Sequence, residues 1–377
     1  MTIALDARFL LHGFVHPHSR LVHIFLRRNR QAPYPARIVL CTDKPPEPAA
    51  FDRDYGAPNV TVEVLGRAGG RLQRLRWLLE GLPRALKRCG ASVFYSSFYF
   101  LPPRCEGVRL VNTIHDCCVF YIDPGLNRGL LSRPAYLWLL RRAMLWTNRR
   151  ADATITVSNF SKRMLQRHLG LPEAKIRVCY HGLDLDGANG VPFRDSLLGK
   201  ANQTPYFLFV GSNLPKKNIA QCIAGFARLP EEVRRRYVLR LKTDCYPENR
   251  EQIDALGIGT RVEFVSGHLD PRAMADLYAG ATLLLLLSYD EGFGLPIIES
   301  FAAGVPVLVS NRAACGELVT VPECKADPDD TAEIAAKWLA LTEDRGLRAR
   351  CLLEQERLLP QFGAKKTADT FYQSLVA

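Results

Sequence analysis

Short apolar runs alternate along the chain with amphipathic segments. Apolar runs bounded by turn residues predict strands, and apolar residues repeated every three or four positions predict helices. In the first half, this pattern predicts strands at 2–10, 36–43, 60–65, 91–97, 108–116 and 151–158, and helices at 19–30, 71–89 and 133–150. Such alternation is typical of a parallel sheet with helices on both faces, an α/β fold.

The second half repeats the same order of elements. It predicts strands at 205–212, 237–244, 262–267, 281–288 and 306–311, helices at 218–229, 271–280 and 295–304, and a helical tail from Thr331. Asp270 stands before Pro271 as an expected helix N-cap, and Gly304 occupies an expected position just past a helix.

The stretch at 185–204 is rich in Gly, Asp, Asn and Pro and has little periodicity, so we expect an interdomain linker there. A length of 377 residues suits two domains. We therefore expect one Rossmann-like domain over 1–190, a second over 204–355, and a terminal helix over 356–377.

Composition places the chain among globular proteins, with 47% hydrophobic and 23% charged residues. The longest apolar run, Ala281–Leu287, is far shorter than the roughly 20 residues of a membrane span. Asp6 lies in the first apolar segment with no basic region before it, so we expect a strand and not a signal peptide. The eleven scattered cysteines fit free thiols in a reducing compartment, and we expect a cytoplasmic protein.

The positive charge is concentrated in the first half. Residues 1–190 hold 28 Lys and Arg against 14 Asp and Glu, a balance of +14, whereas residues 191–377 have a balance of −2. Two basic segments, 71–88 and 133–150, combine Leu and Trp with arginines. This pattern suits a helix lying on an anionic membrane and equally a core helix with a solvated basic face. The charge bias favours peripheral membrane association. We find no aromatic platform or reading motif for nucleic acid, and we expect no nucleic-acid partner.

The residues 288–311 form the densest group of candidate chemistry. A strand, a Gly-containing loop and a helix follow one another, and helix N-termini at strand ends attract phosphates. The backbone N–H groups expected to face a phosphate are those of Gly292, Phe293, Gly294 and Leu295. Glu291 and Glu299 supply carboxylates, which accept hydrogen bonds from sugar hydroxyls. A plain Gly-rich turn with two glutamates is the alternative interpretation of this segment.

Two other segments carry candidate chemistry with structural alternatives. Lys216 and Lys217 follow a predicted strand and suit a phosphate, or form a solvated pair. Asp327 and Asp329 have the spacing of a metal-binding Asp-x-Asp motif, but turn chemistry before a helix explains them better.

Seven segments together resemble a known family. They are EGFGLPIIE (291–299), FAAGVPVLVSN (301–311), GELV (316–319), FLFVGSNLPKKNI (207–219), VSNFSK (157–162), CYHGLD (179–184) and NTIHDCCVFYIDP (112–124). In their order along the chain, from about 112 to 330, they resemble the retaining glycosyltransferases of family 4, whose GT-B fold has two Rossmann-like domains facing a cleft. Gly316 stands where proline is common in that family.

The resemblance implies roles for the donor-binding residues. Glu299 would bind the ribose hydroxyls of a nucleoside diphosphate sugar, and Glu291 the hydroxyls of its sugar. Lys217 and Lys216 would hold the diphosphate, with Gly211 allowing the strand end to pass close to it.

The resemblance also implies roles in the first domain. His115 would lie near the donor sugar and act in catalysis with Lys217 and Glu291, while Asp116 orients its loop or assists the acceptor. The family's glycine-rich first loop is only partly matched here. Gly13 remains as an acceptor-side residue, and Arg20 is a candidate for the basic position. His12, His16 and His18 in this region lack acidic partners and ordinary helical spacing, so we expect no metal site.

The function implied is the transfer of a hexose, with retention, from a nucleoside diphosphate sugar to a glycan or lipid-linked glycan in bacterial surface polysaccharide synthesis. We expect GDP-mannose as donor and neither cofactor nor metal. A UDP-sugar or dTDP-rhamnose is the alternative donor. Nucleotide-sugar epimerisation and nucleic-acid binding are the alternatives of another class.

Overall fold

The computed structural model describes residues 1–8, 10, 17–65, 76–97, 101–121, 123, 125, 133–183 and 204–377. The chain divides into two compact units. The first comprises Met1–Phe120, Ala135–Gly182 and Ala364–Ala377, and the second comprises Tyr121–Pro134 and Leu183–Gly363. This division differs from the expected one, because Tyr121–Pro134 groups with the second unit and the return to the first comes at Ala364. The expected linker falls largely on 184–203, outside the described residues.

The first unit is built on a seven-stranded parallel sheet, in the order β3-β2-β1-β4-β5-β6-β7. The strands are β1 (Thr2–Asp6), β2 (Arg37–Thr42), β3 (Val60–Val64), β4 (Val93–Ser96), β5 (Arg109–Thr113), β6 (Ala153–Thr156) and β7 (Ile176–Val178). The helices are α1 (Arg20–Gln31), α2 (Pro48–Tyr55), α4 (Leu82–Arg88), α5 (Pro134–Asn148), α6 (Asn159–Leu169) and α15 (Ala364–Val376).

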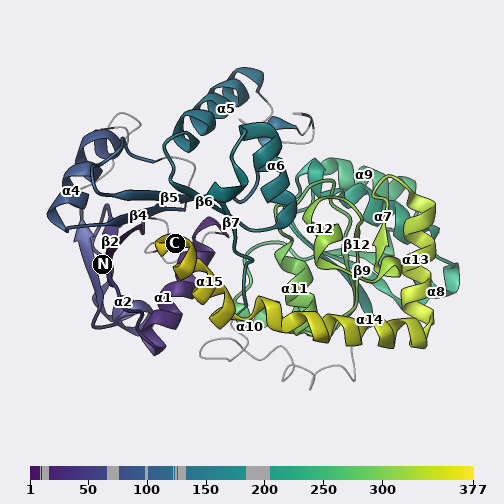
Figure 1. Ribbon diagram of the computed structural model, residues 1–377. Helices are drawn as coiled ribbons and strands as arrows, with labels where there is room; N and C mark the ends of the chain where they lie inside the picture. The colour runs from purple at the N-terminus through teal and green to yellow at the C-terminus, as the bar shows by residue number, and fades with distance from the viewer. Residues whose placement is uncertain are drawn as a thin grey trace. The chain divides into compact units, whose positions relative to one another are not determined.

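Helices cover both faces of this sheet, with α1 and α15 on one side and α5 and α6 on the other (Figure 1). The C-terminal helix α15 packs against α1, where Phe371 contacts Phe25 with ring centroids 5.4 Å apart. Pro83 lies where the π-helical segment Trp77–Gly81 passes into α4, and the backbone stays helical on both sides of it.

The second unit has a six-stranded parallel sheet in the order β10-β9-β8-β11-β12-β13. Its strands are β8 (Tyr206–Val210), β9 (Val238–Lys242), β10 (Val262–Phe264), β11 (Ala281–Leu286), β12 (Val307–Ser310) and β13 (Lys325–Ala326). Its helices are α7 (Ile219–Arg228), α8 (Glu231–Arg236), α9 (Pro247–Ala255), α10 (Pro271–Ala279), α11 (Leu295–Ala302), α12 (Ala313–Leu318), α13 (Thr331–Glu343) and α14 (Arg345–Leu358).

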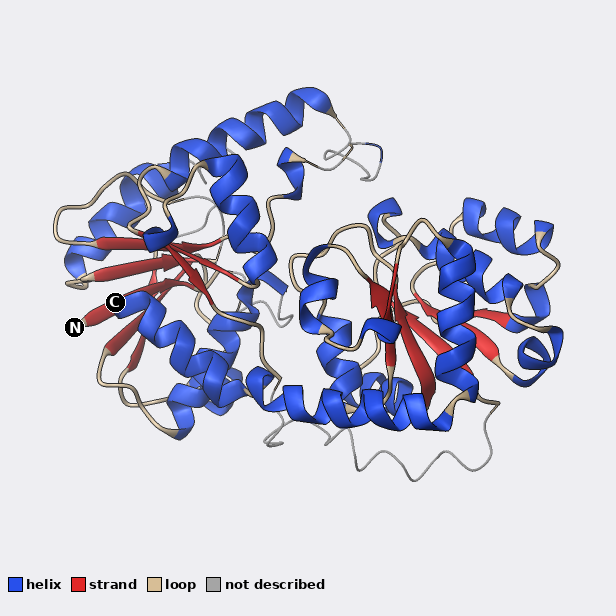
Figure 2. Cartoon of the chain, turned by 45° about the vertical axis from the view of Figure 1, so that its right-hand side comes forward, coloured by secondary structure: helices blue, strands red, loops and turns tan. Residues whose placement is uncertain are grey.

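This unit is also doubly wound, with helices on both faces of its sheet (Figure 2). Helix α7 packs against α9 and α13, and α11 packs against α10 and α14. The α7–α13 contact needs a glycine, because a Cβ on Gly225 would lie 2.9 Å from the Ile334 side chain. The expected N-cap is confirmed, since Asp270 accepts a hydrogen bond from the backbone N–H of Ala273.

No helix within the described ranges has the length and hydropathy that crossing a bilayer requires.

Candidate functional site

Strands β8 and β11 meet at the point where the second sheet reverses its strand order. Strands β9 and β10 lie beyond β8 on one side, and β12 and β13 lie beyond β11 on the other. Because all pairs are parallel, the loops that leave the carboxyl ends of β8 and β11 meet at this switch point. In open α/β sheets, ligands bind outside the strands at this position. The two loops carry Lys216, Lys217 and Glu291, and Glu299 lies on α11, the helix that follows the second loop.

Lys217 and Glu291 bridge the two loops directly. The Lys217 Nζ donates to Glu291 Oε1 at 2.5 Å, and the side chains are only 19% and 11% exposed. The hydroxyl of Ser288 donates to the same Oε1 at 2.9 Å. The ammonium group is therefore held at the strand ends, where an arriving anion competes with Glu291 for it.

Lys216 lies beside a second acidic residue of the β11 loop. Its Nζ is 4.0 Å from Oδ2 of the buried Asp290, while the Tyr121 hydroxyl donates to Oδ1 at 2.7 Å. The backbone N–H of Tyr289 donates to the Lys216 carbonyl at 2.9 Å. Two lysines and a backbone hydrogen bond thus fix one loop against the other.

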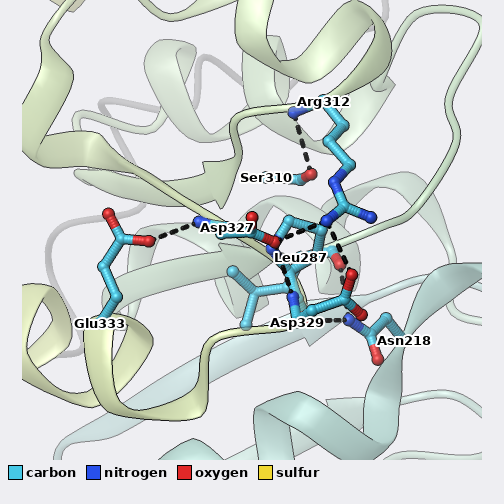
Figure 3. Close-up of polar contacts among 8 residues, drawn as sticks. Asn218, Leu287, Ser310, Arg312, Asp327, Asp329 and Glu333 are labelled. Atoms are coloured by element: carbon cyan, nitrogen blue, oxygen red, sulfur yellow. Dashed lines mark hydrogen bonds and ion pairs between the residues drawn. The ribbon is translucent and has the colours of Figure 1, made fainter.

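Asn218 joins this loop pair to the body of the unit (Figure 3). It has a left-handed conformation (φ 56°) between the short helix Pro215–Lys217 and α7. Its buried amide donates to the carbonyls of Leu287 and Pro328, at 3.0 and 2.9 Å. Asparagine tolerates this conformation better than most residues, and its two hydrogen bonds hold the turn that aims the lysines.

The loop after β11 ends in a glycine that starts α11. Gly294 has φ 100°, and a Cβ there would lie 3.0 Å from the Ile297 side chain. Pro296 in the first turn has no N–H, and the Ile297 N–H donates to Gly294 at 3.0 Å. Helix α11 therefore begins at Leu295, as expected, at the end of the loop that contains Gly292 and the buried Phe293.

Glu299 lies on α11 and contacts a tyrosine of the neighbouring helix. The hydroxyl of Tyr278, buried on α10, donates to Glu299 Oε2 at 2.6 Å. This hydrogen bond holds one oxygen of the Glu299 carboxylate in place. It thereby sets the orientation in which the carboxylate can accept hydrogen bonds from a pair of hydroxyls.

Gly211 lies directly after β8, and its backbone N–H donates to the Lys242 carbonyl at 3.3 Å. A Cβ there would lie 3.1 Å from the Phe209 ring and 3.9 Å from Cδ of Lys217. The glycine therefore lies against the lysine expected to bind phosphate.

A buried thiol also lies close to the Lys217–Glu291 pair. Burial, reinforced by the Glu291 carboxylate, raises the pKa of Cys315 well above its ordinary value. The thiol is accordingly neutral at physiological pH and unsuited to nucleophilic attack.

In the first unit, His115 belongs to a stack of three histidines from separate segments. Its ring is parallel to that of His181 (5.3 Å, 7°) and edge-on to that of His18 (4.7 Å, 68°). Its Nε2 is 3.3 Å from the His18 carbonyl oxygen. Burial, followed by the charges of its basic neighbours, lowers the pKa of His181 well below its ordinary value, so that ring is neutral at pH 7.

Two further residues of the first unit are tied down locally. The Asp116 carboxylate accepts from the Cys118 backbone N–H at 3.3 Å, which agrees with the expected loop-orienting role. Arg20 donates to the Gly182 carbonyl at 3.2 Å, next to His181. Gly13, His12 and His16 lie outside the described residues.

The Asp-x-Asp segment is occupied by an arginine (Figure 3). Arg312 is 2.7 Å from Asp327 Oδ1 and 2.7 Å from Asp329 Oδ2. The backbone N–H of Asp329 donates to Asp327 at 2.9 Å, a turn hydrogen bond of the expected kind. The helix N-cap, however, is the next residue, Asp330, whose carboxylate accepts from the first turn of α13. Over the described residues, no group of three or more His, Cys, Asp or Glu is arranged to hold a metal ion.

Several of these residues were not singled out from the sequence. Tyr278, Asn218 and His181 act through partners that are distant in sequence, whereas Ser288 acts on Glu291, three residues away. Asn218 and His181 do lie inside segments of the family resemblance, 207–219 and 179–184, and Ser288 lies in the segment 288–311 that holds the densest candidate chemistry.

The geometry defines a class: two doubly wound α/β units, one with lysines and glutamates at its switch point, as in GT-B glycosyltransferases. The model described as "Glycosyltransferase Family 4" matches residues 19–186, and the one described as "Glycosyl transferases group 1" matches residues 195–353. Residues 19–186 are therefore a family 4 glycosyltransferase domain and residues 195–353 a group 1 glycosyltransferase domain, and the two together span most of the chain.

Curated relatives are similar over part of their length. The O-antigen chain mannosyltransferase B of Escherichia coli is 28% identical over 68% of this chain and 66% of its own. The O-antigen chain mannosyltransferase RfbU of Salmonella typhimurium is 26% identical over 58% of this chain and 56% of its own. The chain thus spans about two thirds or less of these relatives.

Solved structures share the fold over nearly the whole chain. Anabaena HepE in complex with UDP has a TM-score of 0.72 at 17% identity and 99% coverage of both chains. Sucrose-phosphate synthase from Thermosynechococcus elongatus has a TM-score of 0.72 at 20% identity, covering 99% of this chain and 98% of its own. The two-unit fold is therefore that of GT-B enzymes.

Proposed function

We propose that this chain transfers a hexose, with retention of anomeric configuration, from a nucleoside diphosphate sugar to a glycan or lipid-linked glycan in bacterial surface polysaccharide synthesis. The observation that carries the proposal is the Lys217–Glu291 pair at the switch point of the second unit, with Glu299 one helical turn beyond. This arrangement offers cations to a diphosphate and carboxylates to sugar and ribose hydroxyls.

The diphosphate would replace Glu291 as the ion-pair partner of Lys217. Both groups already lie at the strand ends, so binding requires a small shift of an ammonium group and no loop rearrangement. Glu291, released from its ion pair, would then accept hydrogen bonds from the sugar. In this scheme Lys217, Lys216 and the start of α11 stabilise the charge that develops on the leaving phosphate. The reaction would need no metal, because these groups neutralise that charge.

The acceptor side of the proposal rests on the first unit. The histidine stack around His115 supplies a buried polar group suited to contact with a hydroxyl of the reacting sugar. Asp116, held by its loop hydrogen bond, and Gly13 complete the acceptor-side assignment. The acceptor proton would pass to the leaving phosphate oxygen, on the same face of the sugar.

GDP-mannose is the proposed donor. Its support is that several curated relatives are mannosyltransferases, among them O-antigen chain enzymes of E. coli and Salmonella. A UDP-sugar is the second candidate, because Anabaena HepE has been solved with UDP-glucose. A dTDP-rhamnose donor has no comparable support.

The test is a transfer assay with radiolabelled GDP-mannose, UDP-glucose and dTDP-rhamnose, using lipid-linked glycans as acceptors and EDTA in every reaction. We expect label from GDP-mannose in the glycan, with an α-anomeric product by NMR from the α-linked donor. Transfer from another donor only would refute the choice of mannose, and an inverted product would refute retention. Transfer that requires added Mg²⁺ or Mn²⁺ would refute the metal-free scheme.

A further inference from the structure

The outer face of helix α5 exposes large apolar side chains. Trp138, Leu139 and Trp146 are 62%, 59% and 51% exposed. They lie on one side of the helix, whereas Leu137 and Met144 are buried on the other. Helix α5 is therefore apolar on two opposite sides. The helix lies beside β5 and β6, and only the side with Leu137 and Met144 packs into the first unit (Figure 1). Exposed apolar groups gathered in this way mark an interaction surface.

The same surface is basic. The sequence has no acidic residue between Asp123 and Asp152, Arg142 and Arg149 are exposed, and Arg150 is partly exposed. Two guanidinium groups lie against the exposed indoles: Arg142 is 5.7 Å from the Trp138 ring centroid, and Arg150 is 3.3 Å from that of Trp146. Positive charge and aromatic surface thus lie side by side.

The two basic segments of the first unit differ in how their tryptophans are exposed. Trp77, in the segment at 71–88, is only 6% exposed, and the Arg8 guanidinium covers its ring at 3.8 Å. That tryptophan belongs to the core around Leu82 and Leu86. Of the two segments, α5 alone presents its tryptophans outward.

We propose that the outer face of α5, formed by Trp138, Leu139, Arg142, Trp146 and Arg149, docks on an anionic lipid surface. Tryptophan prefers the headgroup region of a bilayer, and arginine is drawn to anionic headgroups. A helix with Trp and Leu among arginines suits the plane of that interface. A second copy of the chain fits poorly, because a two-fold contact would set these arginines against each other. Leu139 has no matching group in a nucleic acid, whereas the interface of a bilayer accepts it together with the indoles.

The test is co-sedimentation of the full chain with phosphatidylcholine vesicles that contain or lack phosphatidylglycerol. We expect binding to the anionic vesicles only, with release at high salt. The double variant Arg142→Gln/Arg149→Gln should bind about thirty-fold more weakly, since each arginine near an anionic surface contributes a factor of about five. Its control, Arg30→Gln/Arg37→Gln, makes the same charge change at exposed positions of the first unit and should bind as the wild type.

Tryptophan fluorescence tests the apolar half of the proposal. Of the four tryptophans, Trp77 and Trp338 are buried, so a lipid-induced blue shift would come from the two on α5. Trp138→Ser/Trp146→Ser should abolish the shift and vesicle binding, and Trp138→Phe/Trp146→Phe should retain binding. Leu353→Ser, at a 68% exposed leucine of the second unit, is the control and should change neither.

Three results would overturn the proposal. They are no binding of wild type to anionic vesicles, equal losses in test and control variants, or a concentration-dependent dimer that the serine variant dissolves while vesicle binding persists. The proposal does not rest on the reaction above. Titrating the same variants with nucleoside diphosphates shows whether the donor site is intact, so failure at the membrane and failure of the proposed function remain distinguishable.

Discussion

The Lys217–Glu291 pair leads to a prediction that separates stability from ligand binding. Lys217→Met removes the ammonium group and leaves the nearly buried Glu291 carboxylate with a hydrogen bond from the Ser288 hydroxyl. A hydrogen bond to a charged group contributes about 1.5–3 kcal/mol, so we expect a loss of about 2 kcal/mol in the free energy of unfolding. For a unit of this size, that loss lowers Tm by about 4–8 °C.

The double variant Lys217→Met/Glu291→Gln should regain most of this stability, because it replaces the unpaired charge with a neutral amide. It should not regain nucleoside diphosphate binding, since the cation that meets the phosphates is still missing. Calorimetric unfolding measures the first quantity and isothermal titration the second.

Arg235→Gln is the matched control. Arg235 also makes a 2.5 Å ion pair, with Glu231, but the side chains are 72% and 66% exposed. Its loss should change stability by less than ~0.5 kcal/mol and leave ligand binding unaltered. The reasoning is refuted if Lys217→Met is as mild as this control, or if the double variant binds the nucleotide as well as wild type.

Three further changes have expected outcomes that urea unfolding can check. Tyr278→Phe removes the hydrogen bond to Glu299, so it should cost about 1.5–3 kcal/mol and weaken nucleotide binding; unchanged values for both would contradict the positioning role. Asn218→Ala loses two hydrogen bonds at φ 56° and should cost about 2–4 kcal/mol, whereas Asn218→Gly should cost about 1 kcal/mol less, because glycine adopts that conformation freely. Burial, helped by nearby arginines, lowers the pKa of His23 to about 4. Below about pH 6.5 the unfolded chain therefore binds a proton at His23, whereas the folded chain does not. Wild-type stability should therefore fall by about 2 kcal/mol more than that of His23→Gln between pH 7 and pH 5, and parallel losses would contradict this.

Most of the sheet strands and their order along the chain were accessible from the sequence, but the short edge strands β7 and β13 were not predicted. Ala281–Leu287 was predicted as a buried strand and forms β11, because a run of aliphatic residues has no solvent-facing side in a central parallel strand. The segment 2–10 was predicted as one strand, but β1 ends at Asp6, whose carboxylate pairs with Arg8 at 2.6 Å. Local patterns do not contain such tertiary partners.

The candidate site was accessible in part for the same reason. Lys217 and Glu291 were selected separately, and the sheet topology brings them together across 74 residues. The histidine stack was not predicted because His18, His115 and His181 come from three segments far apart in the sequence, and only the fold brings their rings together. Asn218 was not predicted because its role depends on a left-handed backbone conformation and on hydrogen bonds to two carbonyls that are distant in sequence. The ion pairs of Arg312 with Asp327 and Asp329 were not predicted either, because they join the loop after β12 to the loop before α13.

The most direct test of the central claim is calorimetric titration of wild type and Glu299→Ala with GDP, UDP and dTDP in the presence of EDTA. The account predicts that one nucleoside diphosphate binds wild type, and that the variant binds it at least about tenfold more weakly, because a charged hydrogen bond is lost. Equal affinity in the two proteins would contradict the assignment of Glu299. No binding by wild type, even with Mg²⁺ added, would contradict the donor site at the switch point.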